Sequence, residues 1–80
     1  MFYVYVLKSS VDGRLYKGFT KNLELRVKQH NQGKVRSTKG YRTWKLVYFE
    51  TFNVLAEARQ RELYFKSGEG REFLQKQLAP

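Results

Sequence analysis

The feature that most constrains this chain is an Asp-Gly pair at residues 12–13, which separates two apolar, tyrosine-bearing runs. The runs cover residues 2–8 and 14–19 and are rich in Tyr, Phe and Val, residue types that favour strands. Asp-Gly between two such runs is a strong signal for a tight β-hairpin turn. The start of the chain is therefore predicted to form two antiparallel strands.

The length of the hairpin loop decides which tyrosines share a face of the sheet. A two-residue loop, formed by Asp12-Gly13 or by Val11-Asp12, pairs odd positions of the first strand with even positions of the second. This register puts Tyr5 and Tyr16 on one face and Lys17 on the other. A three-residue loop without a bulge would separate the two tyrosines instead.

A helix is predicted directly after the hairpin. Asn22 is a suitable N-cap for a helix over residues 23–32, and Gly33 is its C-terminal stop. Arg26 and His30 are four residues apart, so they project side by side along one edge of this helix. These two side chains can therefore reach a common point.

The stretch from Gly33 to Lys45 is strongly basic. It holds no acidic residue and two glycines, which is typical of a mobile surface loop. Such a loop suits contacts with the phosphates of a nucleic acid. Its basic residues are Lys34, Arg36, Lys39, Arg42 and Lys45.

A third strand is predicted over residues 44–51. Alternation along it puts three residues on one face, Trp44, Leu46 and Tyr48, and three on the other, Lys45, Val47 and Phe49.

Two more helices are predicted after this strand. Asn53 is a suitable cap for a helix over residues 54–66, and a Ser-Gly-Glu-Gly break precedes a last helix over residues 69–78. The chain is therefore predicted to have an α+β fold, with a small central three-stranded antiparallel sheet flanked by helices.

Glu62 interrupts the apolar face of the helix over residues 54–66. The rest of that face is formed by Leu55, Ala58 and Phe65. An acid at such a position is disfavoured unless it pairs with a cation or a metal ion. The residues alone leave both explanations open.

Composition bounds the class of protein. Eighty residues are enough for one domain with one modest core, so residues 1–80 are expected to form a single domain. The absence of cysteine excludes disulfides, thiolate nucleophiles and Cys-based metal sites. No apolar run approaches the roughly 18 residues of a membrane span, so we expect a cytoplasmic protein without a membrane segment. The net charge of +9 favours a polyanionic partner, with nucleic acid as the first expectation.

Taken singly, the polar residues named above also have ordinary structural explanations. Tyr5 and Tyr16 fit as sheet aromatics, and Arg26 fits as a surface charge. His30, near the end of its helix, suits the negative end of the helix dipole.

Taken together and in order, these residues resemble the GIY-YIG nuclease superfamily in its short, stand-alone bacterial form. The first signature element is matched by Tyr3-Val4-Tyr5 and the second by Tyr16-Lys17-Gly18, with ten residues between Tyr5 and Tyr16. Arg26 stands at the place of the family's arginine and His30 follows it by four residues. Glu62 stands at the place of the family's glutamate. The resemblance implies a single catalytic domain over residues 1–80.

The family's reaction is metal-dependent hydrolysis of a phosphodiester. By the resemblance, Glu62 would hold one divalent metal ion, Mg²⁺ or Mn²⁺, and Arg26 would contact the scissile phosphate. Tyr5 would activate or orient the attacking water, and Tyr16 and His30 would complete the site. Because the reference pKa of His is near 6.5 and that of Tyr near 10, His30 is the chemically easier proton acceptor. Whether Tyr5 or His30 takes the proton is left open.

The resemblance implies a DNA substrate. Lys34, Arg36, Lys39 and Arg42 would hold its backbone without reading its sequence. The missing side chain of Gly18 would let a phosphate or a helix approach closely. We therefore expect a structure-directed or weakly sequence-specific endonuclease, with a role in DNA repair or recombination. The alternatives are a non-catalytic nucleic-acid-binding module and a subunit recruited by a protein partner, and a homodimer also stays open.

Overall fold

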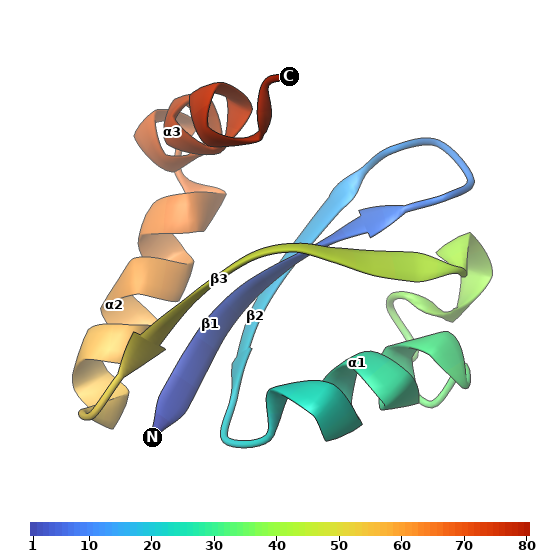
Figure 1. The fold of residues 1–80 in the computed structure, drawn as a ribbon, viewed down its shortest axis with the longest axis horizontal. Helices are drawn as coiled ribbons and strands as arrows, with labels where there is room; N and C mark the ends of the chain where they lie inside the picture. Colours follow the sequence, from blue (N-terminus) through green and yellow to red (C-terminus); the bar gives the residue numbers. More distant parts are fainter.

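The computed structural model describes residues 1–80 as a three-stranded antiparallel sheet with helices on both faces (Figure 1). The strands lie in the order β2-β1-β3, and the elements are β1 (Phe2–Ser9), β2 (Leu15–Thr20), α1 (Leu23–Asn31), a short 3₁₀ helix (Lys39–Tyr41), β3 (Trp44–Phe52), α2 (Leu55–Lys66) and α3 (Gly68–Leu78). The predicted α+β fold is confirmed. None of the helices is long and apolar enough to cross a membrane.

The two faces of the sheet bury two apolar clusters. α1 covers the face of Tyr5 and Leu7, whereas α2 and α3 cover the face of Val4 and Val6 (Figure 1). The α2 and α3 residues buried there are Ala58, Phe65 and Leu74. Because side chains alternate along a strand, β1 contributes to both clusters and lies at the centre of the molecule.

The hairpin has the predicted parity but a longer loop. Ser9 N donates to Arg14 O at 2.9 Å, so the loop covers residues 10–13, and Gly13 has a φ of +77°. The two-residue loop was therefore a wrong prediction. The observed loop also contains an even number of residues, so odd positions of β1 still face even positions of β2, and Tyr16 lies directly opposite Leu7.

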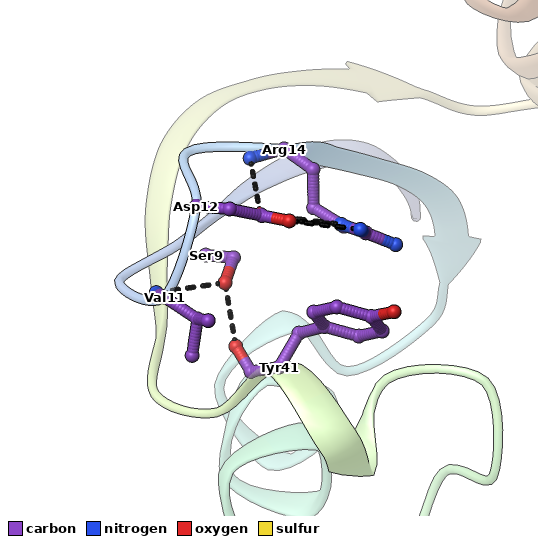
Figure 2. Close-up of polar contacts among 5 residues, drawn as sticks. All are labelled: Ser9, Val11, Asp12, Arg14 and Tyr41. Atoms are coloured by element: carbon purple, nitrogen blue, oxygen red, sulfur yellow. Dashed lines mark hydrogen bonds and ion pairs between the residues drawn. The ribbon is translucent and has the colours of Figure 1, made fainter.

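The hairpin loop is tied to the 3₁₀ helix (Figure 2). Ser9 Oγ donates to Tyr41 O at 2.7 Å and accepts from Val11 N at 3.0 Å. The Arg14 guanidinium pairs with Asp12 and lies 3.6 Å from the centre of the Tyr41 ring. Hydrogen bonds from Arg14 hold the pKa of Asp12 below its usual value. These contacts connect the hairpin with the chain that follows α1.

α1 begins and ends where its capping residues predict. Asn22 Oδ1 accepts from Leu25 N at 3.1 Å, and Gly33 follows the helix with a φ of +78°. The basic stretch after it is not the open loop that its composition predicts. Thr38 is buried, and its carbonyl accepts from Trp44 Nε1 at 2.8 Å, so the stretch is anchored to the core.

A β-bulge in β3 changes which residues share a face. Val6 pairs with Tyr48 but Leu7 pairs with Leu46, which leaves Val47 as an extra residue. Trp44 and Leu46 pack with Tyr5 and Leu7, whereas Tyr48 packs on the opposite face. Strict alternation therefore placed Tyr48 and Phe49 on the wrong faces.

The second and third helices start at residues other than those predicted. Asn53 is not the cap of α2, because Val54 occupies the N-cap position and no side chain caps the helix. α3 begins at Gly68 rather than Glu69, and Ser67 Oγ accepts from Gly70 N at 3.2 Å as its cap. The Ser-Gly-Glu-Gly segment is therefore the start of a helix rather than a break.

Candidate active site

The site is built around the side chain of Tyr5, which reaches across β2 over Gly18. These two residues face each other in the β1–β2 ladder. A Cβ at Gly18 would lie 2.7 Å from Tyr5 Oη and 3.1 Å from Tyr16 Cε2. The space beside Gly18 is thus filled by two tyrosine rings, which corrects the expectation that it admits a phosphate or a helix.

His30 holds the Tyr5 hydroxyl from the helix side. Tyr5 Oη lies 3.0 Å from His30 Nε2, and His30 Nδ1 lies 2.8 Å from Thr38 Oγ1. Tyr5, His30 and Thr38 are each at most 1% exposed. Sequence reasoning missed Thr38, because a lone threonine in a basic stretch carries no periodic or motif signal.

Tyr16 and Trp44 complete the aromatic wall of the site. The Tyr16 ring centre lies 4.9 Å from that of His30 and 6.3 Å from that of Tyr5. Trp44 packs against Tyr16 at 6.3 Å between ring centres and is 4% exposed. Trp44 is therefore a core residue.

Charged groups on two helices affect the pKa of Tyr5. Burial raises the pKa of Tyr5 to about 12, Arg26 opposes this rise, and Tyr16 and the carboxylate of Glu62 add to it. Arg26 comes from α1, where its Nη1 donates to Gln29 Oε1 at 3.2 Å, and Glu62 comes from α2. Charges from both covering layers therefore act on one hydroxyl.

Glu62 has one cationic partner. Its Oε1 lies 3.4 Å from Lys66 Nζ, one turn further along α2. The Glu62 side chain is 16% exposed whereas that of Lys66 is 51% exposed, so a flexible and solvated cation covers a mostly buried carboxylate. A metal ion can displace such a partner at small cost, since exposed ion pairs contribute roughly 0–1 kcal/mol.

The donor set around Glu62 suits a hard cation that keeps most of its water. No group of three or more His, Asp or Glu side chains gathers anywhere in the chain, so Glu62 would be a single protein ligand. Mg²⁺ is commonly held by one or two carboxylates and retains several waters. The residues present fit this use.

The four basic residues predicted to bind substrate all lie on the surface. Lys34, Arg36, Lys39 and Arg42 are exposed, and none of them forms an ion pair. Arg42 Nε donates to Lys39 O at 2.8 Å, which holds the Arg42 guanidinium against the loop. The stretch that carries these residues meets the Tyr5 site through Thr38.

Lys17 lies on the other face of β2, as the register predicts. Burial lowers the pKa of Lys17, and the nearby positive charges of Arg71 and Lys66 lower it further. Its pairing partner Val6 belongs to the cluster under α2 and α3. Lys17 is therefore separated from the tyrosines by the sheet.

The fold and these contacts define a small α+β domain that packs two tyrosines and a histidine together, with Arg26 on the same helix as His30 and Glu62 on α2. The family model of the GIY-YIG catalytic domain matches residues 1–76. The chain belongs to the GIY-YIG family of nuclease domains. Nucleases of this family typically use divalent metal ions.

The chain is also similar to several small bacterial proteins. It is 51% identical over 67 residues to a UPF0213 protein of Clostridium perfringens, a match that covers 82% of this chain and 71% of that protein. It is 49% identical over 65 residues to a UPF0213 protein of Bacillus licheniformis, covering 80% of this chain and 66% of that one. The solution NMR structure of a UPF0213 protein of Bacillus halodurans matches the whole chain and 89% of its own, with 33% identity and a TM-score of 0.61. The resemblance and the fold predicted from the sequence are both confirmed.

The His30 imidazole is expected to stay uncharged from neutral pH down to about pH 4, because burial and then the charge of Arg26 lower its pKa from 6.5 to about 4. Between these values the unfolded chain binds more protons than the folded chain. The free energy of unfolding should therefore fall as the pH falls from 6.5 to about 4. An NMR titration of this single histidine measures the pKa directly.

The variant His30→Gln is the control for the pH dependence of stability. This substitution should remove most of the dependence of the free energy of unfolding on pH in this range, because carboxylates titrate mainly at lower pH. A folded-state pKa near 6.5 would contradict the prediction.

Proposed function

We propose that this protein is a metal-dependent endonuclease that hydrolyses DNA phosphodiester bonds and is structure-directed or only weakly sequence-specific. The observation that carries the proposal is the buried hydrogen bond between Tyr5 Oη and His30 Nε2, 3.0 Å long. Hydrolysis of a phosphodiester needs a proton acceptor, a cationic contact for the phosphate and a carboxylate for a metal ion. In the proposal Tyr5 and His30 supply the acceptor, Arg26 the cationic contact and Glu62 the carboxylate.

Arg26, Glu62 and Tyr16 each have a distinct role in the proposed reaction. The planar guanidinium of Arg26 binds the scissile phosphate and stabilises the charge that develops on it. Glu62 would hold Mg²⁺ or Mn²⁺, and the ion would supply positive charge that stabilises the transition state. Tyr16 packs against the His30 ring and fixes its orientation.

The proton moves from the attacking water through Tyr5 to His30. The pKa of Tyr5 is about 12 and that of His30 about 4. At neutral pH Tyr5 therefore carries its proton, and the His30 ring is uncharged and has a nitrogen that can accept one. Tyr5 gives its proton to His30 Nε2 while its oxygen takes a proton from water. When Arg26 binds a phosphate, its charge no longer opposes protonation of His30, so the pKa of His30 rises as the substrate binds.

The exposed cations at residues 34, 36, 39 and 42 hold the DNA backbone beside this site. Contacts with phosphates position a duplex or a branched molecule without reading its bases. Binding should therefore weaken steeply as salt is raised, with little dependence on sequence. A role in DNA repair or recombination follows if branched DNA is the preferred substrate.

Incubation with branched and linear DNA of the same sequence, with Mg²⁺ or Mn²⁺ or with a chelator, tests the proposal. We expect cleavage that needs the metal ion and is faster on branched DNA. Salt-sensitive binding without cleavage would replace the proposal with a non-catalytic nucleic-acid-binding module. Failure to bind DNA or RNA at low salt would favour a subunit recruited by a protein partner.

Gly18→Ala is expected to lower cleavage about 100-fold, because the added methyl group would lie 2.7 Å from Tyr5 Oη. The Tyr5 ring is buried and hydrogen-bonded to His30, so it cannot move aside without losing that contact. Single-turnover rates on branched DNA measure the effect. Gly40→Ala is the matched control, since nothing lies within 4 Å of the added Cβ there, and it should cleave like the unchanged protein. Equal rates for both variants would contradict the role of Gly18.

A further inference from the structure

The Thr38 side chain has a position that neither the proposed reaction nor the family signature explains. It is 1% exposed, and its hydroxyl lies 2.8 Å from His30 Nδ1 and 3.3 Å from Val35 O. Its backbone carbonyl accepts from Trp44 Nε1 at 2.8 Å. Thr38 is therefore held from two sides while it faces the ring nitrogen that does not touch Tyr5.

The proton positions in this row of contacts follow from donor and acceptor counts. The Tyr5 hydroxyl has one proton, and its charged neighbour Arg26 can only donate. The one acceptor within hydrogen-bond distance of Tyr5 Oη is His30 Nε2. A buried hydroxyl proton is rarely left without an acceptor, so Nε2 must present its lone pair to Tyr5.

The other end of the row agrees with this assignment. If Nε2 of the neutral ring carries no proton, Nδ1 carries one and donates it to Thr38 Oγ1. The Thr38 hydroxyl then gives its own proton to Val35 O. In the opposite tautomer, Thr38 would donate to Nδ1, and the Tyr5 proton would have no acceptor. One arrangement therefore satisfies every buried proton in the row.

We propose that Thr38 is a positioning residue, which holds the proton of His30 on Nδ1 and so keeps Nε2 free to accept the proton of Tyr5. The inference rests on the proposed function for its effect on catalysis, but the tautomer of His30 can be tested without any cleavage. Thr38 also lies among the four exposed cations of residues 34–42, so the stretch that meets DNA is the one that orients the base.

The test is the ¹⁵N NMR signature of the imidazole, which distinguishes a protonated ring nitrogen from an unprotonated one. The chain has one histidine, so the signals belong to His30 without further assignment. At pH 7 the unchanged protein should show a protonated Nδ1 and an unprotonated Nε2. A protonated Nε2 would overturn the proposal, and this measurement needs no variant.

Two substitutions separate the hydroxyl from the shape of the side chain. Thr38→Ser keeps the hydroxyl and should keep the tautomer. Thr38→Val keeps the shape but removes the acceptor of the Nδ1 proton, so the Nε2-protonated form should become populated. An unchanged tautomer in a folded Thr38→Val protein would overturn the proposal.

Cleavage gives the second readout. Thr38→Val should lower kcat about 10- to 100-fold with little change in KM, because it alters the base and leaves the phosphate contacts in place. Thr38→Ser should restore the rate. A normal rate in Thr38→Val would overturn the positioning role. If the unchanged protein cuts no DNA, the proposed function and this catalytic effect fail together, whereas the tautomer is decided by NMR alone.

Discussion

Replacing Glu62 with Gln is expected to lower the rate of DNA cleavage about 1,000-fold and to leave DNA binding intact. Gln keeps the size of the side chain but loses the charge that would hold the metal ion beside Tyr5. A bound metal contributes several kcal/mol to the transition state, and a loss of about 4 kcal/mol corresponds to about 10³ in rate. Single-turnover rates over a range of Mg²⁺ concentrations measure the change.

Glu57→Gln is the matched control for this prediction. Glu57 is exposed in the first turn of the same helix, so its substitution removes the same charge from an exposed position of α2. It should cleave at the normal rate. Folding should survive Glu62→Gln, because Gln keeps the size of the side chain and the partner cation, Lys66, is half exposed. Cleavage by Glu62→Gln at the rate of the control would exclude Glu62 as the metal ligand.

Gly70→Ala is expected to destabilise the fold by about 3 kcal/mol or more, the upper part of the range for overpacked cores. An added Cβ would lie within bonding distance of the Tyr64 carbonyl oxygen and 2.6 Å from Phe65 Cα. These are backbone atoms of α2, so relief requires α3 to move away from the core that holds Leu74. Urea denaturation measures the free energy of unfolding, and thermal melting should show a Tm lower by roughly 10–25 °C.

Gly68→Ala tests whether this effect comes from contact rather than from the loss of a glycine. Gly68 lies two positions earlier in α3, and nothing lies within 4 Å of a Cβ added there. Ala in a helix is favoured over Gly by up to about 1 kcal/mol, so this variant should be neutral or slightly more stable. Equal destabilisation by both substitutions would show that the approach of α3 to α2 is looser than described.

Local sequence patterns predicted the hairpin and the first helix correctly. Apolar alternation and the turn residues predicted β1 and β2, and the caps at Asn22 and Gly33 predicted α1 within about one residue. The shared face of Tyr5 and Tyr16 was predicted although the loop length was wrong, because only the parity of the loop matters.

Local sequence patterns did not predict the bulge at Val47. Nothing in the alternation of residues 44–51 marks an extra residue, because the bulge exists only in the pairing of β3 with β1. The start of α3 is similar. Its Gly-Glu-Gly sequence has low helix propensity, but Ser67 caps it and only a residue without a Cβ fits at Gly70 beside α2.

The sequence by itself determined the α+β class, the family, the face shared by Tyr5 and Tyr16, and the adjacency of Arg26 and His30. The shared face and the adjacency depend on spacing within one hairpin or one helix, which strand and helix periods convert directly into geometry. The class and the family depend on the order of elements and motif residues along the chain. Only the tertiary structure decided that Tyr5 fills the space over Gly18 and that Thr38 reaches His30. These contacts depend on how separate elements pack and which way side chains turn, and the residue pattern specifies neither.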